Sequence, residues 1–428
     1  MTKALDLSQI DRPAPRYQAI LDRDGDRVPD VLRLDSNPIP ATDPIDFSRY
    51  TSREFHDREM AKMWSRVWQF ACREEHVANR GDYYVYEIGR WSLIVSRDEG
   101  GVLKAYYNSC LHRGTKLKPS NGRGSAGQIQ CPYHGWTWNL GGDLVKVPCA
   151  WDFPHLNYGE MRLPEARVAT WNGLVFVNLS DEGPDLLEYL EVLPEHFGNW
   201  GMTDWYVSVH ARKELPCNWK AAQDAFIEAY HTNLIHPQCV GTAGDINAQH
   251  DIFGDHVSRD LVALGVSSPS LAAPLGDQEI LDMMLLGDGS IIGERPRLKE
   301  GETARSVMAG NMRETFRDQF GLDLSGRSTA ELIDSIKYTL FPNLFIFAGI
   351  SLRVLYVYRP LGDDPNRSTF DILFMRPMPK GGERPEPAEL VLVGEEDSYR
   401  DVPGMDPGFG ELFDQDTGIL RAQRDGML

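Results

Sequence analysis

The chain has 428 residues, a length that exceeds a single hydrophobic core and predicts two or three domains. Hydrophobic residues make up 42% and charged residues 25%, which excludes disordered and collagen-like chains. The 63 acidic and 44 basic residues give a formal net charge of -19, which disfavours nucleic acids and anionic lipids as partners. No stretch approaches the roughly 18 uninterrupted apolar residues of a membrane span, and the N-terminus lacks an apolar signal segment. We therefore expect a cytoplasmic protein that contacts no membrane.

The first part of the chain is predicted to hold a small antiparallel β domain. Residues 1–45 are rich in Asp, Pro and Arg and predict an extended arm over a surface or a neighbouring subunit. A helix is predicted over 52–70 from the spacing of its apolar residues behind Thr51 and Ser52. Short alternating runs separated by glycines follow, and they predict β-hairpin strands at 83–88, 92–96, 102–108 and 128–130. We place the end of this domain near residue 165.

The sequence pattern of the second part predicts an α+β domain built on an antiparallel sheet. Strands are predicted at 174–179, 344–350, 352–359 and 369–376, and helices at 186–197, 218–235 and 411–426. Residues 379–408 are rich in Pro, Gly and Glu and predict a surface excursion. The predicted division is therefore an arm at 1–45, a first domain at 46–165 and a second domain at 166–428.

Two of the six cysteines stand among histidines at metal-ligand spacing. A reducing compartment disfavours disulfides, so the others are expected to be core residues. Cys110-x-His112 and Cys131-x2-His134 are separated by a loop-forming stretch, and each pair lies between predicted strands. Two thiolates and two imidazoles on opposed loops suit a [2Fe-2S] cluster with sulfur ligands on one iron and nitrogen ligands on the other. A Cys2His2 zinc site and two unrelated core clusters are the competing interpretations, but a zinc finger usually keeps its cysteines together.

A second candidate metal site lies in the predicted helix at 218–235. His231 and His236 are five residues apart, which on a regular helix separates them by about 140°. They can share a metal only if the helix loosens or ends between them, and Pro237 is consistent with an ending. Two histidines and one carboxylate form the facial triad that holds Fe(II) with open positions. Alone, such a pair is more often structural.

In combination, these motifs resemble the catalytic α subunit of Rieske non-haem iron oxygenases, of the aromatic-ring-hydroxylating dioxygenase type. Neither cysteine loop has a spare cysteine, as in the lower-potential Rieske centres of oxygenases. The resemblance implies a small antiparallel β Rieske domain followed by a helix-grip (START-like) catalytic domain. It also implies that Cys110, His112, Cys131 and His134 hold the cluster and that His231 and His236 are ligands of a mononuclear Fe(II).

The resemblance further assigns an electron bridge to an acidic residue three before the first histidine, here Glu228. In the family this residue links an iron ligand to a cluster ligand of the neighbouring subunit. The chain has Glu where Asp is commoner, and Asp224-Ala225 where an acidic-Asn pair is usual, so Ala225 supplies no amide beside the iron. Asp224, seven residues before His231, is the substitute bridge candidate, and an ordinary surface acid is its alternative interpretation.

The third iron ligand must come from a distant segment. Asp416 is the expected ligand, because the segment from Phe413 resembles the family's C-terminal helix. Asp414 is the alternative, and Asp397 and Asp401 are less favoured. As an alternative, these acidic residues stand at the start of a helix, where they interact favourably with the helix dipole and bind no metal.

The implied function is that of a terminal oxygenase in a multicomponent system. Electrons from NAD(P)H would arrive through a separate reductase or ferredoxin, since neither a nucleotide-binding fingerprint nor a plant-type ferredoxin cysteine set is evident. The expected substrates are O2 and a hydrophobic aromatic or alicyclic compound, with or without a carboxylate, as in aromatic hydrocarbon catabolism. Monooxygenation, cis-dihydroxylation and oxidative N- or O-demethylation remain open. The expected assembly is a homotrimer, with or without a β subunit.

Two other classes of function are weighed against this one. A Rieske electron carrier fused to a lipid-binding module predicts no mononuclear iron, and a zinc-stabilised interaction protein predicts no Rieske cluster. Other candidate pocket residues are His250 and His256, with Arg259 as a partner for a substrate carboxylate. The apolar runs at 261–266, 283–286 and 345–347 are candidate pocket walls, although core packing explains them equally well.

Overall fold

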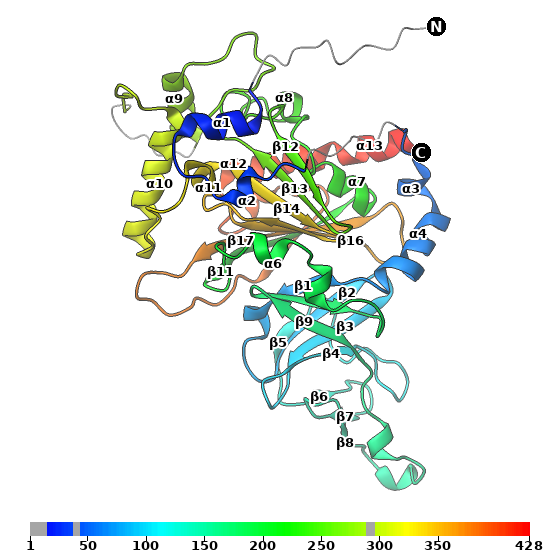
Figure 1. The fold of residues 1–428 in the computed structure, drawn as a ribbon. Helices are drawn as coiled ribbons and strands as arrows, with labels where there is room; N and C mark the ends of the chain where they lie inside the picture. Colours follow the sequence, from blue (N-terminus) through cyan, green and yellow to red (C-terminus); the bar gives the residue numbers. More distant parts are fainter. Residues whose placement is uncertain (1–14, 37–42, 288–295) are drawn as a thin grey trace.

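A computed structural model describes residues 15–36, 43–287 and 296–428, and its two main parts are stacked one on the other (Figure 1). The first part contains a seven-stranded sheet and a three-stranded sheet, and the second contains an eight-stranded sheet. The predicted α+β class with antiparallel sheets is confirmed. None of the described helices has the length and apolar character needed to cross a membrane.

The seven-stranded sheet of the first domain has the order β1-β10-β9-β4-β3-β2-β5. Its strands are β1 (Gln69–Arg73), β2 (Asp82–Ile88), β3 (Trp91–Arg97), β4 (Leu103–Tyr107), β5 (Arg123–Ser125), β9 (Glu165–Trp171) and β10 (Leu174–Asn178). The hairpin strands predicted from alternating residues are confirmed. Because β9 pairs with β4, and β10 with β1, the sheet continues past residue 165. The strand predicted at 174–179 therefore belongs to the first domain, and the boundary falls after β10.

The three-stranded sheet projects from the far end of the first domain. It contains β6 (Ile129–Gln130), β7 (Thr137–Trp138) and β8 (Leu144–Lys146), followed by the short 3-10 turns η4 (Ala150–Asp152) and η5 (Tyr158–Glu160). Figure 1 shows these elements at the lower end of the molecule. The 3-10 turn η3 (Glu74–Val77) connects β1 to β2 on the side facing the second domain.

The eight-stranded sheet of the second domain has the order β12-β13-β14-β15-β16-β17-β11-β18. Its strands are β11 (Trp205–Leu215), β12 (Gln249–Phe253), β13 (Val257–Val262), β14 (Ser335–Leu340), β15 (Leu344–Phe347), β16 (Val354–Pro360), β17 (Ser368–Pro377) and β18 (Leu390–Val393). The neighbouring strands are antiparallel except for β18, which runs parallel to β11. The predicted excursion at 379–408 is thus wrong in part, because its residues 390–393 add an edge strand to the sheet.

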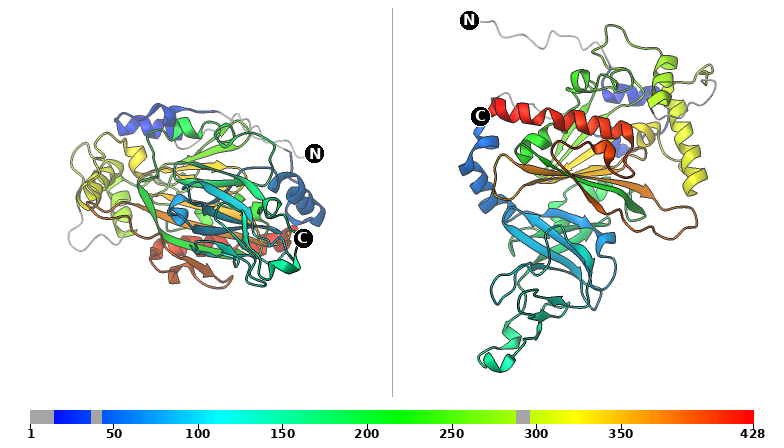
Figure 2. Two further views of the ribbon diagram at one scale, coloured as in Figure 1. Left: turned by 90° about the horizontal axis from the view of Figure 1, so that it is seen from below. Right: turned by 180° about the vertical axis from the view of Figure 1, so that it is seen from behind.

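Helices cover both faces of this sheet. One face packs against α7 (Trp219–Asp224), α12 (Pro407–Gly418) and α13 (Leu420–Met427), and α8 (Thr232–Ile235) follows α7 along the chain. The core cluster of the other face includes residues of α1 (Tyr17–Asp24), α2 (Asp30–Arg33), α5 (Leu186–Tyr189), α6 (Leu193–His196), α10 (Ala304–Phe320) and α11 (Thr329–Ile333). The helix α9 (Asp277–Gly287) contacts α10. Figure 2 shows α12 and α13 lying across their face. Residues of β16 and β17 belong to the core clusters on both faces of the sheet, so both faces of these two strands are buried.

Four predicted helices are shorter or broken in the structure. The stretch predicted as a helix at 186–197 forms the short helices α5 and α6. The predicted helix at 52–70 comprises α4 (Arg53–Glu59) and a π-helical turn (Met60–Trp64), after the short α3 (Ser48–Thr51), and β1 then begins at Gln69. The stretch 411–426 forms two helices, α12 and α13, and the stretch 218–235 forms α7 and α8 with a gap between them. The arm predicted at 1–45 is not extended at 17–33, where α1 and α2 pack into the core. Residues 1–14 and 37–42 of that arm lie outside the described residues.

A buried ion-pair network holds α1 against the second domain. Arg305 on α10 donates to both Asp24 on α1 (Nε to Oδ1, 2.8 Å) and Asp334 (Nη1 to Oδ1, 2.6 Å). Tyr17 donates from its hydroxyl to the other oxygen of Asp334 (3.1 Å). The Asp334 side chain is fully buried, so its charge depends on these donors.

We expect Arg305→Ala to lower the free energy of unfolding by about 3–5 kcal/mol, because it leaves two buried carboxylates without their cation. Chemical denaturation followed by tryptophan fluorescence measures the loss. Arg317→Ala on the same helix is the control, because Arg317 is exposed and, among the described residues, forms its ion pair with its neighbour Asp318. Equal midpoints for both variants would contradict the structural role of the network.

Candidate metal centres

The two Cys/His loops adopt the same backbone turn. In each loop the backbone N–H of the cysteine donates to the carbonyl of the residue five positions later. Cys110 donates to Thr115 (2.9 Å), and Cys131 donates to Trp136 (2.8 Å). A glycine four residues after each cysteine donates back to the cysteine carbonyl. Gly114 and Gly135 have φ values of +72° and +73°, a conformation that favours glycine. The sequence therefore folds two matching loops that face each other.

The side chains of these loops fit an iron-sulfur cluster. Cys110 and Cys131 are buried, and their thiols are within hydrogen-bond reach of each other. The rings of His112 and His134 lie with centroids 4.8 Å apart, and His112 stacks on Trp136. The Nδ1 atom of His112 is buried and has no hydrogen-bond partner among the described residues, as expected of a nitrogen that ligates a metal. His134 is exposed, so the edge of this centre is open to a partner.

The two histidines of the second centre stand at the two ends of the short helix α8. α7 ends at Asp224, and α8 begins at Thr232 with His231 as its N-cap residue and His236 as its C-cap residue. Glu228 lies in the gap between α7 and α8 and accepts the backbone N–H of His231 (3.1 Å), which fixes the start of α8. His236 has left the helical conformation (φ -121°, ψ 60°), so the separation of about 140° on a regular helix does not apply to this pair.

The structure brings His231, His236 and Asp416 together, with one candidate ligand atom from each within 4.8 Å of the others. Nε2 of His236 lies 2.7 Å from Oδ1 of Asp416, and Nε2 of His231 lies 3.4 Å from the same oxygen. Two imidazoles and one carboxylate at this spacing are the donor set of an Fe(II) facial triad.

Two further side chains orient the histidines. Nδ1 of His231 lies 2.6 Å from Oε1 of Glu228, and Nδ1 of His236 lies 2.8 Å from Oε1 of Gln415. These carbonyl and carboxylate oxygens hold the proton on Nδ1 and leave Nε2 for a metal. Burial lowers the pKa of His231, but its hydrogen bonds to Asp416 and Glu228 outweigh burial and raise the pKa to about 9. Metal binding must therefore release protons from this site.

The alternative site residues lie elsewhere. Asp414 accepts hydrogen bonds from the Ser398 hydroxyl (2.5 Å) and the Tyr399 N–H (2.9 Å), so it caps the turn η6 (Tyr399–Asp401). Asp224 accepts a hydrogen bond from Tyr50 (2.7 Å), and burial raises the pKa of Asp224. It is not the ordinary surface acid of the alternative interpretation. Glu228, by contrast, contacts His231 directly.

Three predicted pocket residues have other partners. Arg259 is fully buried, and its Nη2 donates to Asp251 (2.6 Å), so the expectation that it pairs with a substrate carboxylate is wrong. His250 pairs with Asp260 (3.0 Å) and His256 pairs with Glu191 (3.1 Å). The Asp397 carboxylate accepts the backbone N–H of Gly394, away from the histidines.

Two functional contacts were not foreseen from the sequence. Gln415 holds His236, and Tyr50 holds Asp224. The role of Gln415 could have been predicted from its place next to Asp416, because one turn of α12 presents both residues to the same segment. Nothing in the sequence predicts the contact of Tyr50 with Asp224, since it joins segments 174 residues apart.

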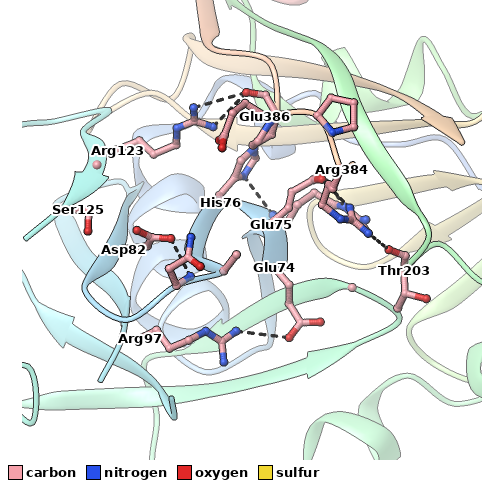
Figure 3. A pocket seen from close by; sticks show the side chains of 17 residues that line it. Glu74, Glu75, His76, Asp82, Arg97, Arg123, Ser125, Thr203, Arg384 and Glu386 are labelled. Carbon is pink, nitrogen blue, oxygen red and sulfur yellow. Dashed lines mark hydrogen bonds and ion pairs between the residues drawn. The ribbon is translucent and has the colours of Figure 1, made fainter. Parts of the chain in front are cut away.

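A cavity of about 730 Å³ lies between the two domains and contains neither centre (Figure 3). Its four arginines have carboxylate partners: Arg97 approaches Glu74 (3.8 Å), and Arg73 (3.5 Å) and Arg384 (3.0 Å) both pair with Glu75. The fourth, Arg123, pairs with Glu389. Because its arginines are paired with carboxylates, we interpret this cavity as a polar contact between the two domains.

Comparison with known proteins agrees with the two centres. Residues 67–157 match the family model "Rieske [2Fe-2S] domain", and residues 202–393 match "Ring hydroxylating alpha subunit (catalytic domain)". The chain therefore joins a Rieske [2Fe-2S] domain to the catalytic domain of a ring-hydroxylating α subunit. Its cofactors are therefore a Rieske [2Fe-2S] cluster and a mononuclear iron.

Curated relatives include both dioxygenases and monooxygenases. The chlorobenzene dioxygenase α subunit of Cupriavidus sp. (strain PS12) is 32% identical over 196 residues, which cover 42% of each chain. The glycine betaine monooxygenase oxygenase subunit of Pseudomonas aeruginosa (strain UCBPP-PA14) is 26% identical over 270 residues, which cover 61% of each chain. The chain spans about half the length of the curated relatives it matches.

Solved structures share the fold over most of the chain. The quaternary ammonium Rieske monooxygenase CntA in complex with L-carnitine superposes with a TM-score of 0.62 at 16% identity, covering 89% of this chain and 84% of CntA. Naphthalene 1,2-dioxygenase from Rhodococcus sp. superposes with a TM-score of 0.59 at 23% identity, covering 90% and 82%. Enzymes with different substrates thus share this Rieske oxygenase fold.

We expect Asp416→Ala to reduce the iron content from about three to about two per chain, because it removes one ligand of the mononuclear site and leaves the cluster. Iron and acid-labile sulfide are measured on anaerobically purified protein. Asp414→Ala is the matched control, since Asp414 caps η6, and it is expected to retain all the iron. Loss of iron from the Asp414 variant, with retention by the Asp416 variant, would overturn the assignment.

Proposed function

We propose that the chain is the terminal oxygenase of a multicomponent system that hydroxylates a hydrophobic small molecule with O2. The observation that carries the proposal is the convergence of His231, His236 and Asp416 in a chain that also holds two matched Cys/His loops. When bound at these three residues, iron supplies open coordination positions at which O2 is activated beside the substrate. The alternative of an electron carrier fused to a lipid-binding module leaves this donor set without a purpose.

We assign the cluster to Cys110, His112, Cys131 and His134. In Figures 1 and 2 their loops, next to β6 and β7, lie at the opposite end of the folded molecule from α8. Electron transfer over that length within one chain is disfavoured, so the path runs between neighbouring subunits. A homotrimer in which the tip of one Rieske domain meets the α8 region of the next subunit supplies that path.

Exposed apolar side chains occur at both ends of this contact. Tyr230 and Leu234, beside the iron ligands, are 77% and 85% exposed. Tyr133 and Trp151, at the tip of the Rieske domain, are 60% and 78% exposed. Apolar residues gathered at two such sites favour burial against a second copy of the chain. Glu228 lies within the first site, and its side chain is 40% exposed.

Glu228 is the proposed bridge between the two centres. One of its oxygens contacts Nδ1 of His231, and its partial exposure leaves it open to a cluster-ligand histidine of the neighbouring subunit. Burial raises the pKa of Glu228, but the hydrogen bond with His231 outweighs burial and lowers it, so the carboxylate is charged at neutral pH. Asp224 is the weaker candidate, because its hydrogen bond is to Tyr50.

Aromatic residues around Asp416 support a hydrophobic substrate. Phe226, Tyr356 and Phe413 belong to one core cluster, and Phe413 lies on the same helix α12 as Asp416. The nearby cation Lys337 pairs with Asp260 (3.0 Å), so this pair offers no net charge to a substrate. A separate reductase or ferredoxin, reduced by NAD(P)H, is the proposed electron donor. The six free cysteines are consistent with a reducing compartment such as the cytoplasm.

Oxidative demethylation is the second candidate reaction. We infer it from relatives named as glycine betaine and carnitine monooxygenase subunits, because both named substrates carry N-methyl groups. Product analysis after reconstitution with a reductase separates the two candidates. Release of formaldehyde indicates demethylation, and retention of oxygen from 18O2 as hydroxyl groups on the carbon skeleton indicates hydroxylation. Absence of both products with every aromatic, alicyclic and N-methylated test compound would contradict the proposal.

We expect Glu228→Gln to slow the oxidation of the reduced cluster by substrate and O2 by at least about tenfold, because the neutral amide weakens the charged bridge. Stopped-flow absorbance of the cluster measures the rate, and metal analysis shows that both centres remain. Asp224→Asn is the matched variant and is expected to retain the rate. If Asp224→Asn is slow and Glu228→Gln is not, Asp224 carries the bridge.

We expect Leu234→Asp to dissociate the trimer, because it places a charge in an apolar contact. Analytical ultracentrifugation measures the mass. Leu392→Asp on β18 is the control, since Leu392 is 62% exposed and lies on another part of the surface. A Leu234→Asp variant that remains as associated as the control would refute the proposed contact.

A further inference from the structure

One buried arginine lacks the ion-pair partner that the others have. Six arginines are buried among the described residues, and five of them contact a carboxylate: Arg73, Arg212, Arg259, Arg305 and Arg359. Arg353, which is 4% exposed, has no carboxylate within 4.0 Å in the described part of the chain. A guanidinium remains charged at neutral pH, and burying it without a counter-ion is unfavourable.

The hydrogen bonds of Arg353 do not replace that counter-ion. Nη1 donates to the Gly201 carbonyl (2.8 Å) and Nη2 donates to the Ala348 carbonyl (3.4 Å). Its Nε has no partner among the described residues. The guanidinium lies 4.0 Å from the centre of the Trp205 ring. Burial, and then the positive charges of Arg327 and Arg73, lower the pKa of Arg353.

Arg353 lines a cavity of about 300 Å³. Most of the walls are aromatic or aliphatic: Trp205, Phe316, Phe320, Leu352, Phe374 and Phe409. The exposed residues Gln319, Ser351 and Arg376 also line it, so the cavity reaches solvent. Asp406 is the lining carboxylate, and it accepts the N–H groups of Gly408 and Phe409 at the start of α12.

The cavity is distinct from both metal centres. Its lining contains no cluster or iron ligand, and it lies at the first turn of α12, whereas Asp416 lies near the end of that helix. It also differs from the cavity between the domains, whose arginines are paired internally. An apolar chamber with one unpaired buried cation matches a ligand that has an apolar body and a single negative charge.

We propose that this cavity is a second ligand site, which binds a small aromatic or alicyclic carboxylate through the Arg353 guanidinium. The carboxylate supplies the missing counter-ion, and its ring packs against Trp205 and the phenylalanines. The proposal does not depend on oxygenase activity, because the site contains none of the metal ligands.

Isothermal titration of the purified protein with benzoate tests the site, with benzamide as the neutral analogue. We expect saturable benzoate binding and no benzamide binding. Arg353→Met should weaken benzoate binding by at least about tenfold, because a charge-assisted hydrogen bond is lost. Gln319→Glu should also weaken it, since it adds a negative charge to the wall with little change of shape. Arg317→Met, outside the cavity on the same helix, should bind as the unmodified protein does.

Two further outcomes decide the proposal. If Arg353→Met fails to fold, Gln319→Glu carries the test, because Gln319 is exposed. His231→Ala separates this site from the iron centre and is expected to retain benzoate binding. Loss of binding in His231→Ala, equal binding in Arg353→Met or Gln319→Glu, or binding of neither benzoate nor cyclohexanecarboxylate to the unmodified protein would overturn the proposal.

Discussion

The contact between α12 and the short α8 is the constraint on which the catalytic domain depends. Asp416 reaches His236 at 2.7 Å although 180 residues separate them. α12 can deliver this carboxylate because its apolar side, including Phe413, packs on the aromatic face of the sheet. The same helix places Gln415 against His236. The packing of one helix on one sheet face therefore sets the position of both a ligand and the group that orients another ligand.

The short helix α8 is the local counterpart of that constraint. His231 and His236 cap its two ends, and His236 has left the helical conformation (φ -121°, ψ 60°), so the separation of about 140° on a regular helix does not apply to them. Glu228 accepts the N–H of His231 at the start of α8 and also contacts its ring. One acidic side chain thus links the start of α8, the orientation of an iron ligand and the proposed route to the neighbouring subunit.

Local motifs were readable from the sequence, and long-range placement was only partly so. The Cys/His loops and the hairpins around them follow from glycine positions and alternating residues. The choice of Asp416 came from a resemblance, because spacing alone did not separate it from Asp414, which caps η6 in the structure. The role assigned to Arg259 was wrong, since its partner Asp251 lies across a β-hairpin and the burial of both was not visible in the sequence. The first-domain boundary was placed too early, because β9 and β10 complete a sheet by pairing with strands far back in the chain.

The central claim is that one chain holds both a Rieske cluster and a mononuclear iron. The ratio of iron to acid-labile sulfide in the anaerobically purified protein tests it most directly. The account predicts about three irons for every two sulfides, two of the irons belonging to the cluster and one to the site of His231, His236 and Asp416. A ratio of one iron to one sulfide after purification with added Fe(II) would leave a cluster without a catalytic iron and would contradict the account.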